Sequence, residues 1–256
     1  MLLFPLVSAA VLIGRLDAGL IAVFGASMSV FLVREPLAVL ARQRFLWKDA
    51  RPETPAAKRT AVVCAPVLAV CGVWLLGVVA ASWLFGMGAA AAALTVLYVW
   101  AGLKGFQRST LLQVVGSLGL SASALLVWLA AGRSPDEVVA VLILLHFIHS
   151  AGAVLTIHAR LEAIRAERKP EIGGRERRAA WLWQLLQAAA TTALAFAAKP
   201  WLAAALAVPL AVHLWDLASL PKPGELRRPL KQIGFRELGV SFVVSALLVA
   251  GLWAGL

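Results

Sequence analysis

Four arginines at the ends of long apolar segments could together bind an anionic group. They are Arg34, Arg108, Arg160 and Arg165. The planar guanidinium of arginine can hold a phosphate through paired N–H donors without a metal ion. These four side chains therefore predict a site for an anionic lipid headgroup or a polyprenyl phosphate. The alternative is that they only hold their connectors on one side of a membrane, as basic residues commonly do.

A second group of polar residues lies within the apolar segment 137–159. At about 100° per residue, His149, Thr156 and Arg160 fall on one helical face, and His146 lies about 60° to its side. Ionisable side chains inside a bilayer cost roughly 2.5–3.5 kcal/mol each on insertion scales. The stripe therefore predicts either residues that line a cavity or neutral histidines that are hydrogen-bonded to neighbouring helices.

Two further polar pairs lie near the same ends of other apolar segments. His213 and Asp216 are three residues apart, as are Gln184 and Gln187, so each pair shares a helical face. The His–Asp pair could orient an imidazole, bind a proton, contribute to a metal site or only make a local hydrogen bond. We predict no metal site and no cofactor from so small a set. The residues expected to line a cytoplasm-facing cavity are Glu35, His146, His149, Thr156, Gln184, Gln187, His213 and Asp216.

Sequence signatures of catalysis are missing from this chain. It has no G-x-S-x-G, no H-E-x-x-H, no phosphate-binding glycine loop and no C-x-x-C. The two cysteines, Cys64 and Cys71, lie about two turns apart on one expected helix, which is too far for a disulfide. The catalytic residues, if there are any, therefore stay unknown.

The elements that must position these residues are membrane-spanning helices. The chain is 61% hydrophobic and 14% charged, whereas about 25% of an average globular domain is charged. Nine apolar segments predict an all-α membrane fold, a single polytopic domain over 1–256. The expected helices are 1–14, 18–33, 61–81, 83–103, 111–131, 137–159, 179–198, 201–220 and 237–256. The first is short and lacks a basic region before it, so we expect it to be truncated at its N-terminus.

The distribution of basic residues predicts the orientation of these helices. Connectors 34–59, 104–108, 160–178 and 222–236 together hold 21 of the 24 Lys and Arg residues, and the others are Arg15, Arg133 and Lys199. Basic connectors stay in the cytoplasm. We therefore expect a cytoplasmic N-terminus and an external C-terminus. The same placement explains the net charge of +11 without nucleic-acid binding.

Three stretches resemble the YwiC-like family of bacterial membrane proteins. They are V-R-E-P-L at 33–37, H-A-R-L-E-A-I-R-A-E-R-K at 158–169 and L-K-Q-I-G-F-R-E-L at 230–238. This resemblance implies a protein of the bacterial inner membrane, but no established activity comes with it. Members typically carry a His-Gly-Ala-Trp-like segment before the run that is M-L-L-F-P-L here, which agrees with the expected truncation.

The arrangement of nine helices with large connectors after the second and sixth also resembles the UbiA-type prenyltransferases. Those enzymes bind Mg²⁺ and a prenyl diphosphate through Asp-rich motifs in these two connectors. Here V-R-E-P-L-A-V-L-A-R and T-I-H-A-R-L-E-A-I-R each offer one carboxylate. Because a Mg²⁺–diphosphate complex needs paired carboxylates, the sequence argues against a Mg²⁺-dependent prenyltransferase.

The leading hypothesis from the sequence is a membrane protein that binds or processes an isoprenoid or an anionic lipid at a cytoplasm-facing cavity. Membrane lipids, including a lipid phosphate, are then its expected partners, and protein partners cannot be inferred. The alternatives are a secondary transporter of a small solute and a non-catalytic membrane subunit of a larger complex.

Overall fold

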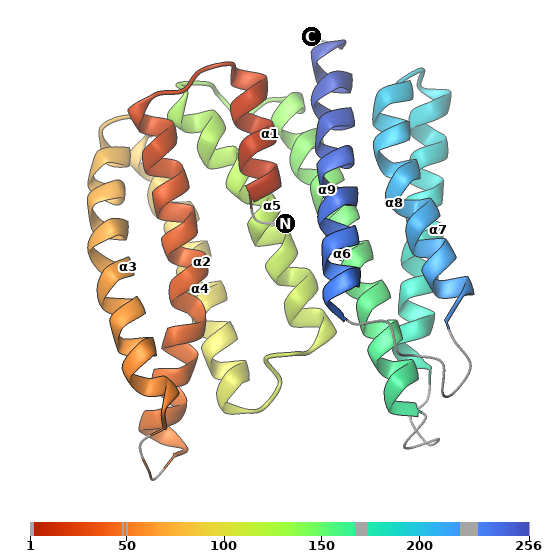
Figure 1. Cartoon of the computed structure of the whole chain (residues 1–256). Helices are drawn as coiled ribbons and strands as arrows, with labels where there is room; N and C mark the ends of the chain where they lie inside the picture. Colours follow the sequence, from red (N-terminus) through yellow and green to blue (C-terminus); the bar gives the residue numbers. More distant parts are fainter. Residues whose placement is uncertain (1–2, 48, 50, 167–173, 221–229, 256) are drawn as a thin grey trace.

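The computed structural model consists of α-helices joined by short connectors (Figure 1). It describes residues 3–47, 49, 51–166, 174–220 and 230–255. Within these ranges there are nine helices and no strand. The helices are α1 (Leu3–Ile13), α2 (Ala18–Phe45), α3 (Glu53–Leu76), α4 (Ala81–Leu103), α5 (Thr110–Ala130), α6 (Glu137–Ala166), α7 (Arg175–Phe196), α8 (Pro200–Ala218) and α9 (Leu230–Trp253).

Seven of these helices are long and apolar enough to cross a bilayer: α2, α3, α4, α5, α6, α8 and α9. A helix of about 20 apolar residues spans the hydrocarbon core. The expected all-α, multi-pass membrane fold is therefore confirmed. Of the other two helices, α1 has 11 residues, and α7 begins with four charged residues and contains Gln184 and Gln187.

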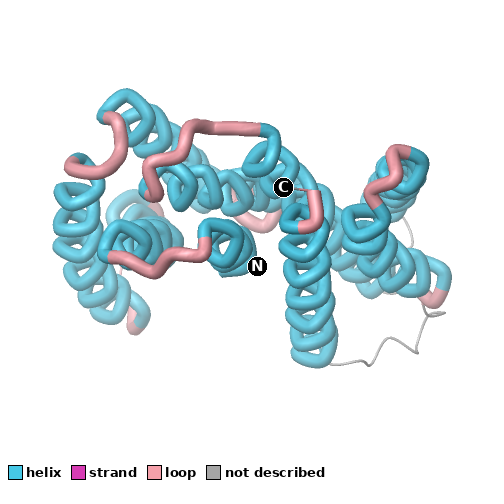
Figure 2. The backbone as a smooth tube through the Cα atoms, turned by 90° about the horizontal axis from the view of Figure 1, so that it is seen from above, coloured by secondary structure: helices cyan, strands magenta, loops and turns pink. Residues whose placement is uncertain are grey.

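Helix α6 lies at the centre of the bundle. It packs against α1, α5, α7, α8 and α9, and more than half of its apolar window is buried inside the protein. On one side, α2 packs against α3, α4 and α5, and α1 joins α5 to α9. On the other side, α7 packs against α6 and α8, and α8 packs against α9. Seen from above, the helices form a left-hand and a right-hand group (Figure 2). The outermost helices, α3 and α4, expose most of their apolar side chains.

The helices run alternately up and down, so that successive connectors lie at opposite ends of the bundle (Figure 1). The ends of α2, α4, α6 and α8 lie at the lower end in that view, which we call the basic end. Arg15, Arg133 and Lys199 lie in connectors at the other end. The alternation places the described basic connectors together, as the charge pattern predicts.

Four expected boundaries are wrong by seven residues or more. Helices α2 and α6 end later than expected, at Phe45 and Ala166, and α3 and α9 begin earlier, at Glu53 and Leu230. We expected the second helix to end at residue 33, but α2 continues through Pro36 to Phe45, because proline removes one backbone hydrogen bond without ending every helix. Helix α3 begins at Glu53, inside a stretch that its charges had marked as a loop. The 28 residues of α2 extend for about 42 Å at 1.5 Å per residue. Its last turns therefore extend beyond an apolar core of about 30 Å.

Candidate functional site

Polar side chains from four helices meet inside the bundle and form what we call the polar cluster. Its members are His149, Gly152, Thr156 and Arg160 of α6, Gln184 and Gln187 of α7, His213 and Asp216 of α8, and Arg236, Glu237 and Ser241 of α9. All of them are buried except Arg236, whose side chain is 32% exposed. His149 lies about 18 Å along α6 from Glu137, near the middle of an apolar core roughly 30 Å thick.

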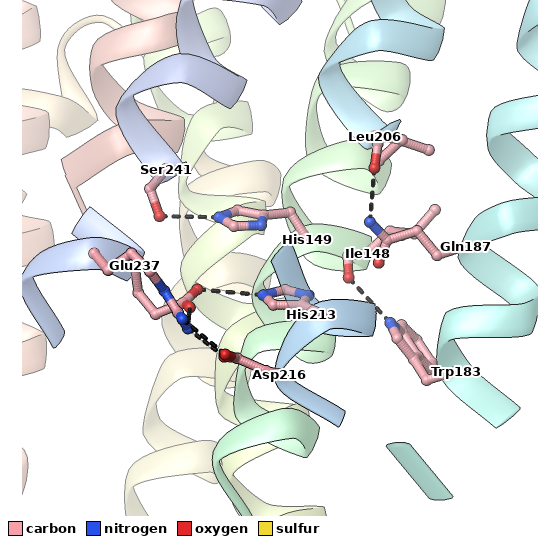
Figure 3. Close-up of polar contacts among 10 residues, drawn as sticks. Ile148, His149, Trp183, Gln187, Leu206, His213, Asp216, Glu237 and Ser241 are labelled. Carbon is pink, nitrogen blue, oxygen red and sulfur yellow. Dashed lines mark hydrogen bonds and ion pairs between the residues drawn. The ribbon is translucent and has the colours of Figure 1, made fainter. Parts of the chain in front are cut away.

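A run of small residues in α6 makes room for this cluster. Ser150, Ala151, Gly152 and Ala153 are consecutive and buried. Small residues let helices approach closely inside a membrane. At this level Trp183 of α7 donates an indole hydrogen bond of 3.1 Å to the Ile148 carbonyl of α6. The bond ties α7 to α6 beside the cluster (Figure 3).

The part of the cluster nearest the basic end consists of charged residues. Arg236 donates two hydrogen bonds to the Asp216 carboxylate, one of them at 2.7 Å from Nη1 to Oδ1. It donates a third bond, of 2.9 Å, to Glu237 Oε1. Arg160 of α6 lies 3.7 Å from Asp216 Oδ1. Two arginines thus balance two carboxylates, which joins α6, α8 and α9 at this end of the bundle.

The next layer contains two stacked histidines. His213 Nε2 lies 3.3 Å from Glu237 Oε2, and His149 Nε2 lies 2.9 Å from the Ser241 hydroxyl. The two imidazole rings are parallel within 1°, with centroids 6.1 Å apart. Figure 3 shows the two rings side by side, with Glu237 and Asp216 next to His213. Protonatable groups therefore continue from the charged layer toward the middle of the membrane.

The glutamines of α7 complete the cluster from the other side. Gln187 Nε2 donates a hydrogen bond of 2.9 Å to the Leu206 carbonyl of α8. Gln187 Oε1, both side-chain polar atoms of Gln184, and the Nδ1 atoms of His149 and His213 have no hydrogen-bond partner among the described residues. A Cβ atom on Gly152 would lie 3.1 Å from Gln187 Oε1, 3.3 Å from His213 Nδ1 and 3.4 Å from Gln184 Nε2. Three of these unpaired atoms thus point at one glycine.

Of the residues expected to line a cavity, the structure brings together six: His149, Thr156, Gln184, Gln187, His213 and Asp216. His146 is buried as well, but its Nε2 lies 3.2 Å from the Ser8 hydroxyl of α1. Glu35 lies apart, on α2, with its side chain 54% exposed and 3.2 Å from Arg42. Glu35 also accepts a hydrogen bond of 2.5 Å from the Tyr98 hydroxyl.

The four arginines expected to form one anion site lie in different surroundings. Arg160 is buried beside Asp216. Arg34 lies on α2, with its guanidinium carbon 5.0 Å from the Phe31 ring centroid and 4.5 Å from that of Tyr98. Arg108 and Arg165 are exposed. Since α2 does not pack extensively against α6, the structure separates Arg34 from Arg160.

Sequence reasoning missed Gly152, Arg236, Glu237 and Ser241. Arg236 and Glu237 lie at the start of the last apolar segment, where charged residues commonly extend to the membrane surface. The available signal was the R-E pair beside Ser241 on a helix, four and five residues before it. Gly152 had a signal too, because it lies within the small run beside His149.

No group of three or more His, Cys, Asp or Glu side chains among the described residues is placed to hold a metal ion. An apolar surface depression lies on α3 around Val70, Val73 and Trp74. A further hollow lies near Arg15 and Asp17, with a volume of about 10 Å³. The polar cluster lies in neither hollow and is closely packed.

A comparison with protein families identifies the first half of the chain. The model described as YwiC-like protein matches residues 1–128. The chain belongs to the YwiC-like family. No curated protein matches it, and no solved structure does, so the likeness to the UbiA-type fold stays a prediction. The match covers α1 to α4 and nearly all of α5, whereas the polar cluster lies on α6 to α9.

Proposed function

We propose that this YwiC-like protein is a secondary transporter of a small, uncharged, hydrogen-bonding solute. Its binding site lies around Gly152, next to Gln184, Gln187, His149 and His213. Because the cluster is closely packed in this state, the solute enters only when the helices around it move apart. Amide and imidazole groups offer both donors and acceptors. The charged residues of the cluster are already paired with one another, so they leave no free charge for an ionic solute.

The observation that carries this proposal is the set of unpaired polar atoms around Gly152. Three such atoms, Gln187 Oε1, His213 Nδ1 and Gln184 Nε2, lie there without a partner among the described residues. Leaving a buried donor or acceptor unpaired costs about 1–3 kcal/mol. A solute with complementary donors and acceptors would recover part of that free energy on binding.

Both ends of this site are closed, which is consistent with an occluded state of a carrier. Toward the basic end lie the paired charges of Arg236, Asp216 and Glu237. Toward the opposite end lie buried leucines of α6, α8 and α9, namely Leu142, Leu145, Leu206 and Leu248. Solute sites of transporters typically lie near the membrane midplane and open to one side at a time.

The test combines binding with a variant that fills the site. Urea, acetamide and glycerol are the probes, and thermal unfolding of the purified protein is the measurement. A probe at 100 times its Kd stabilises the folded state by about 2.7 kcal/mol. In Gly152→Ala the new methyl group lies 3.1–3.4 Å from three side-chain atoms. Because those atoms can shift by a few tenths of an ångström, we expect a folded protein that binds the probe at least tenfold more weakly.

Gly88→Ala is the matched control, since a Cβ on Gly88 meets nothing within 4 Å. This variant should bind like the wild type. The proposal is wrong if no probe stabilises the wild type, or if Gly152→Ala binds the stabilising probe as well as the wild type does. Counterflow of the radiolabelled probe in liposomes then separates a carrier from a protein that only binds the solute.

A lipid-phosphate site at Arg34 is the second candidate function, favoured by a separate observation. The Arg34 guanidinium lies over two aromatic rings, and no carboxylate among the described residues forms an ion pair with it. It lies toward the basic end, which we propose to face the cytoplasm of a bacterial cell on the strength of the charge asymmetry. Arginine in such a place can bind an anionic headgroup, and an Arg34→Ala variant tests this.

A further inference from the structure

We propose that His213 is the proton-coupling residue of the transporter, and that it carries one proton per cycle on Nδ1. This inference rests on the proposed function and deepens it, because it assigns the ion that drives transport. It follows from the hydrogen bonds around the ring and from the position of its second nitrogen.

The partner of Nε2 determines which nitrogen holds the proton of the neutral ring. Nε2 lies 3.3 Å from Glu237 Oε2. An ionised carboxylate can only accept hydrogen bonds, and Glu237 also receives a bond from Arg236, which favours its ionised form. His213 must therefore donate from Nε2, and its Nδ1 carries a free lone pair.

Nδ1 is the nitrogen that faces the solute site. A Cβ on Gly152 would lie 3.3 Å from Nδ1 and 3.1 Å from Gln187 Oε1, and neither atom has a partner among the described residues. In the neutral ring Nδ1 can accept a hydrogen bond from a donor group of the solute. An added proton converts Nδ1 into a donor. It can then donate a hydrogen bond to the unpaired Gln187 Oε1 or to an acceptor of the solute. Proton binding thus changes which solute groups the site can pair.

The charged groups around His213 can accommodate a positive ring. Facing it are Glu237 and Arg236 from α9, and His149 and Arg160 from α6. Asp216 lies one turn further along α8 itself, and the nearby polar side chains of α7, Gln184 and Gln187, do not titrate. The two carboxylates and two arginines balance, so the added proton makes the cluster positive by one charge. Its closest counter-ion is the Glu237 carboxylate, which is bonded directly to the ring.

The stacked position of His149 limits the pair to one added proton. The two ring centroids are 6.1 Å apart, and a charge on one ring opposes a charge on the other. The proton comes from hydronium at the aqueous surface and leaves to water on the other side. On loading, one O–H bond of hydronium breaks and one N–H bond forms at Nδ1; on release, that N–H bond breaks and an O–H bond forms on water.

The variant that tests this inference is His213→Gln. The glutamine amide can keep the donated bond to Glu237 but cannot gain a proton. Purified protein is reconstituted in liposomes, and the labelled probe that stabilises the wild type is supplied with and without a pH gradient. We expect the wild type to accumulate the probe severalfold along an inward proton gradient, and an internal pH dye to report acidification. His213→Gln removes Nδ1 from the site, so it should exchange the probe between equal solutions more slowly than the wild type. That exchange should no longer depend on pH, and the variant should accumulate no probe along the gradient.

His158→Gln is the matched control, because His158 is a half-buried histidine of α6 outside the polar cluster. It should accumulate the probe like the wild type. If wild-type protein exchanges the probe but accumulates none along the gradient, the coupling inference is wrong, and the proposed transporter function is unaffected. If wild-type protein exchanges none of the probes, the proposed function itself is overturned, and the coupling with it. If His213→Gln accumulates the probe like the wild type, His213 is not the coupling residue.

Discussion

Replacing Asp216 by Asn should destabilise the fold strongly, because this carboxylate holds two arginines. Its side chain is 1% exposed, and it accepts two hydrogen bonds from Arg236. It also lies 3.7 Å from Arg160, whose side chain is 7% exposed. Removing one partner of a buried ion pair typically costs about 3–5 kcal/mol, since the other charge is left without compensation.

Arg160 and Arg236 should contribute unequally to that loss. Arg236 is 32% exposed and also bonded to Glu237, so water and Glu237 can compensate it after Asp216 is replaced. Arg160 is nearly buried, and its Nε has no partner among the described residues. We therefore expect most of the cost of Asp216→Asn to come from Arg160. The double variant Asp216→Asn/Arg160→Gln should recover part of it, with a coupling energy of about 1–3 kcal/mol.

The assay is the free energy of unfolding in mixed micelles, measured by titration with a denaturing detergent for the two single variants, the double variant and the wild type. Glu35→Gln is the control, because the Glu35–Arg42 pair is largely exposed at Glu35. Exposed pairs contribute about 0–1 kcal/mol. An Asp216→Asn variant that loses less than about 1 kcal/mol would refute the reasoning. A double variant whose loss of unfolding free energy equals the sum of the two single-variant losses would also refute it.

Two other positions give independent tests. A Cβ on Gly25 would lie 2.7 Å from Cys71 Sγ, where α2 packs on α3, so Gly25→Ala should destabilise by about 1–3 kcal/mol. Gly72→Ala, with nothing within 4 Å, should not, and equal losses in the two variants would contradict this packing. Arg34→Ala should weaken binding to anionic-lipid nanodiscs severalfold, by surface plasmon resonance, whereas Arg44→Ala at the exposed end of α2 should not. Equal binding by Arg34→Ala and wild type would rule out the Arg34 site.

The sequence predicts the membrane fold well, because the bilayer imposes two strong constraints on the order of apolar and basic residues. Apolar segments must be about 20 residues long to cross the core, and basic connectors must stay on one side. Boundaries were the weaker part of the prediction. The second helix was expected to end at residue 33, yet α2 passes through Pro36 to Phe45, because the packing of neighbouring helices outweighs a single lost hydrogen bond.

Much of the polar cluster was also visible in the sequence, as pairs of polar residues on helical faces. His149, Thr156 and Arg160 share a face of α6, and the structure places them in one cluster with polar residues of α7 and α8. Helical periodicity identifies which face of a helix is polar. It does not identify the neighbour that this face meets. For that reason Arg34 and Arg160 looked alike in the sequence, although α2 and α6 belong to different parts of the bundle.

In the proposed transporter, the most direct way to open the site toward the basic end is a movement of the inner half of α8. This half carries His213 and Asp216, and it begins just after Pro209, which lies inside the helix. Proline removes one backbone hydrogen bond and so weakens the helix at that turn. Helix α6, in contrast, is held by α1 and α5 as well as by α7, α8 and α9. A movement of α8 against a fixed α6 would separate His213 from Gly152 and Asp216 from Arg160 at once. The solute site and the charged closure would therefore open together.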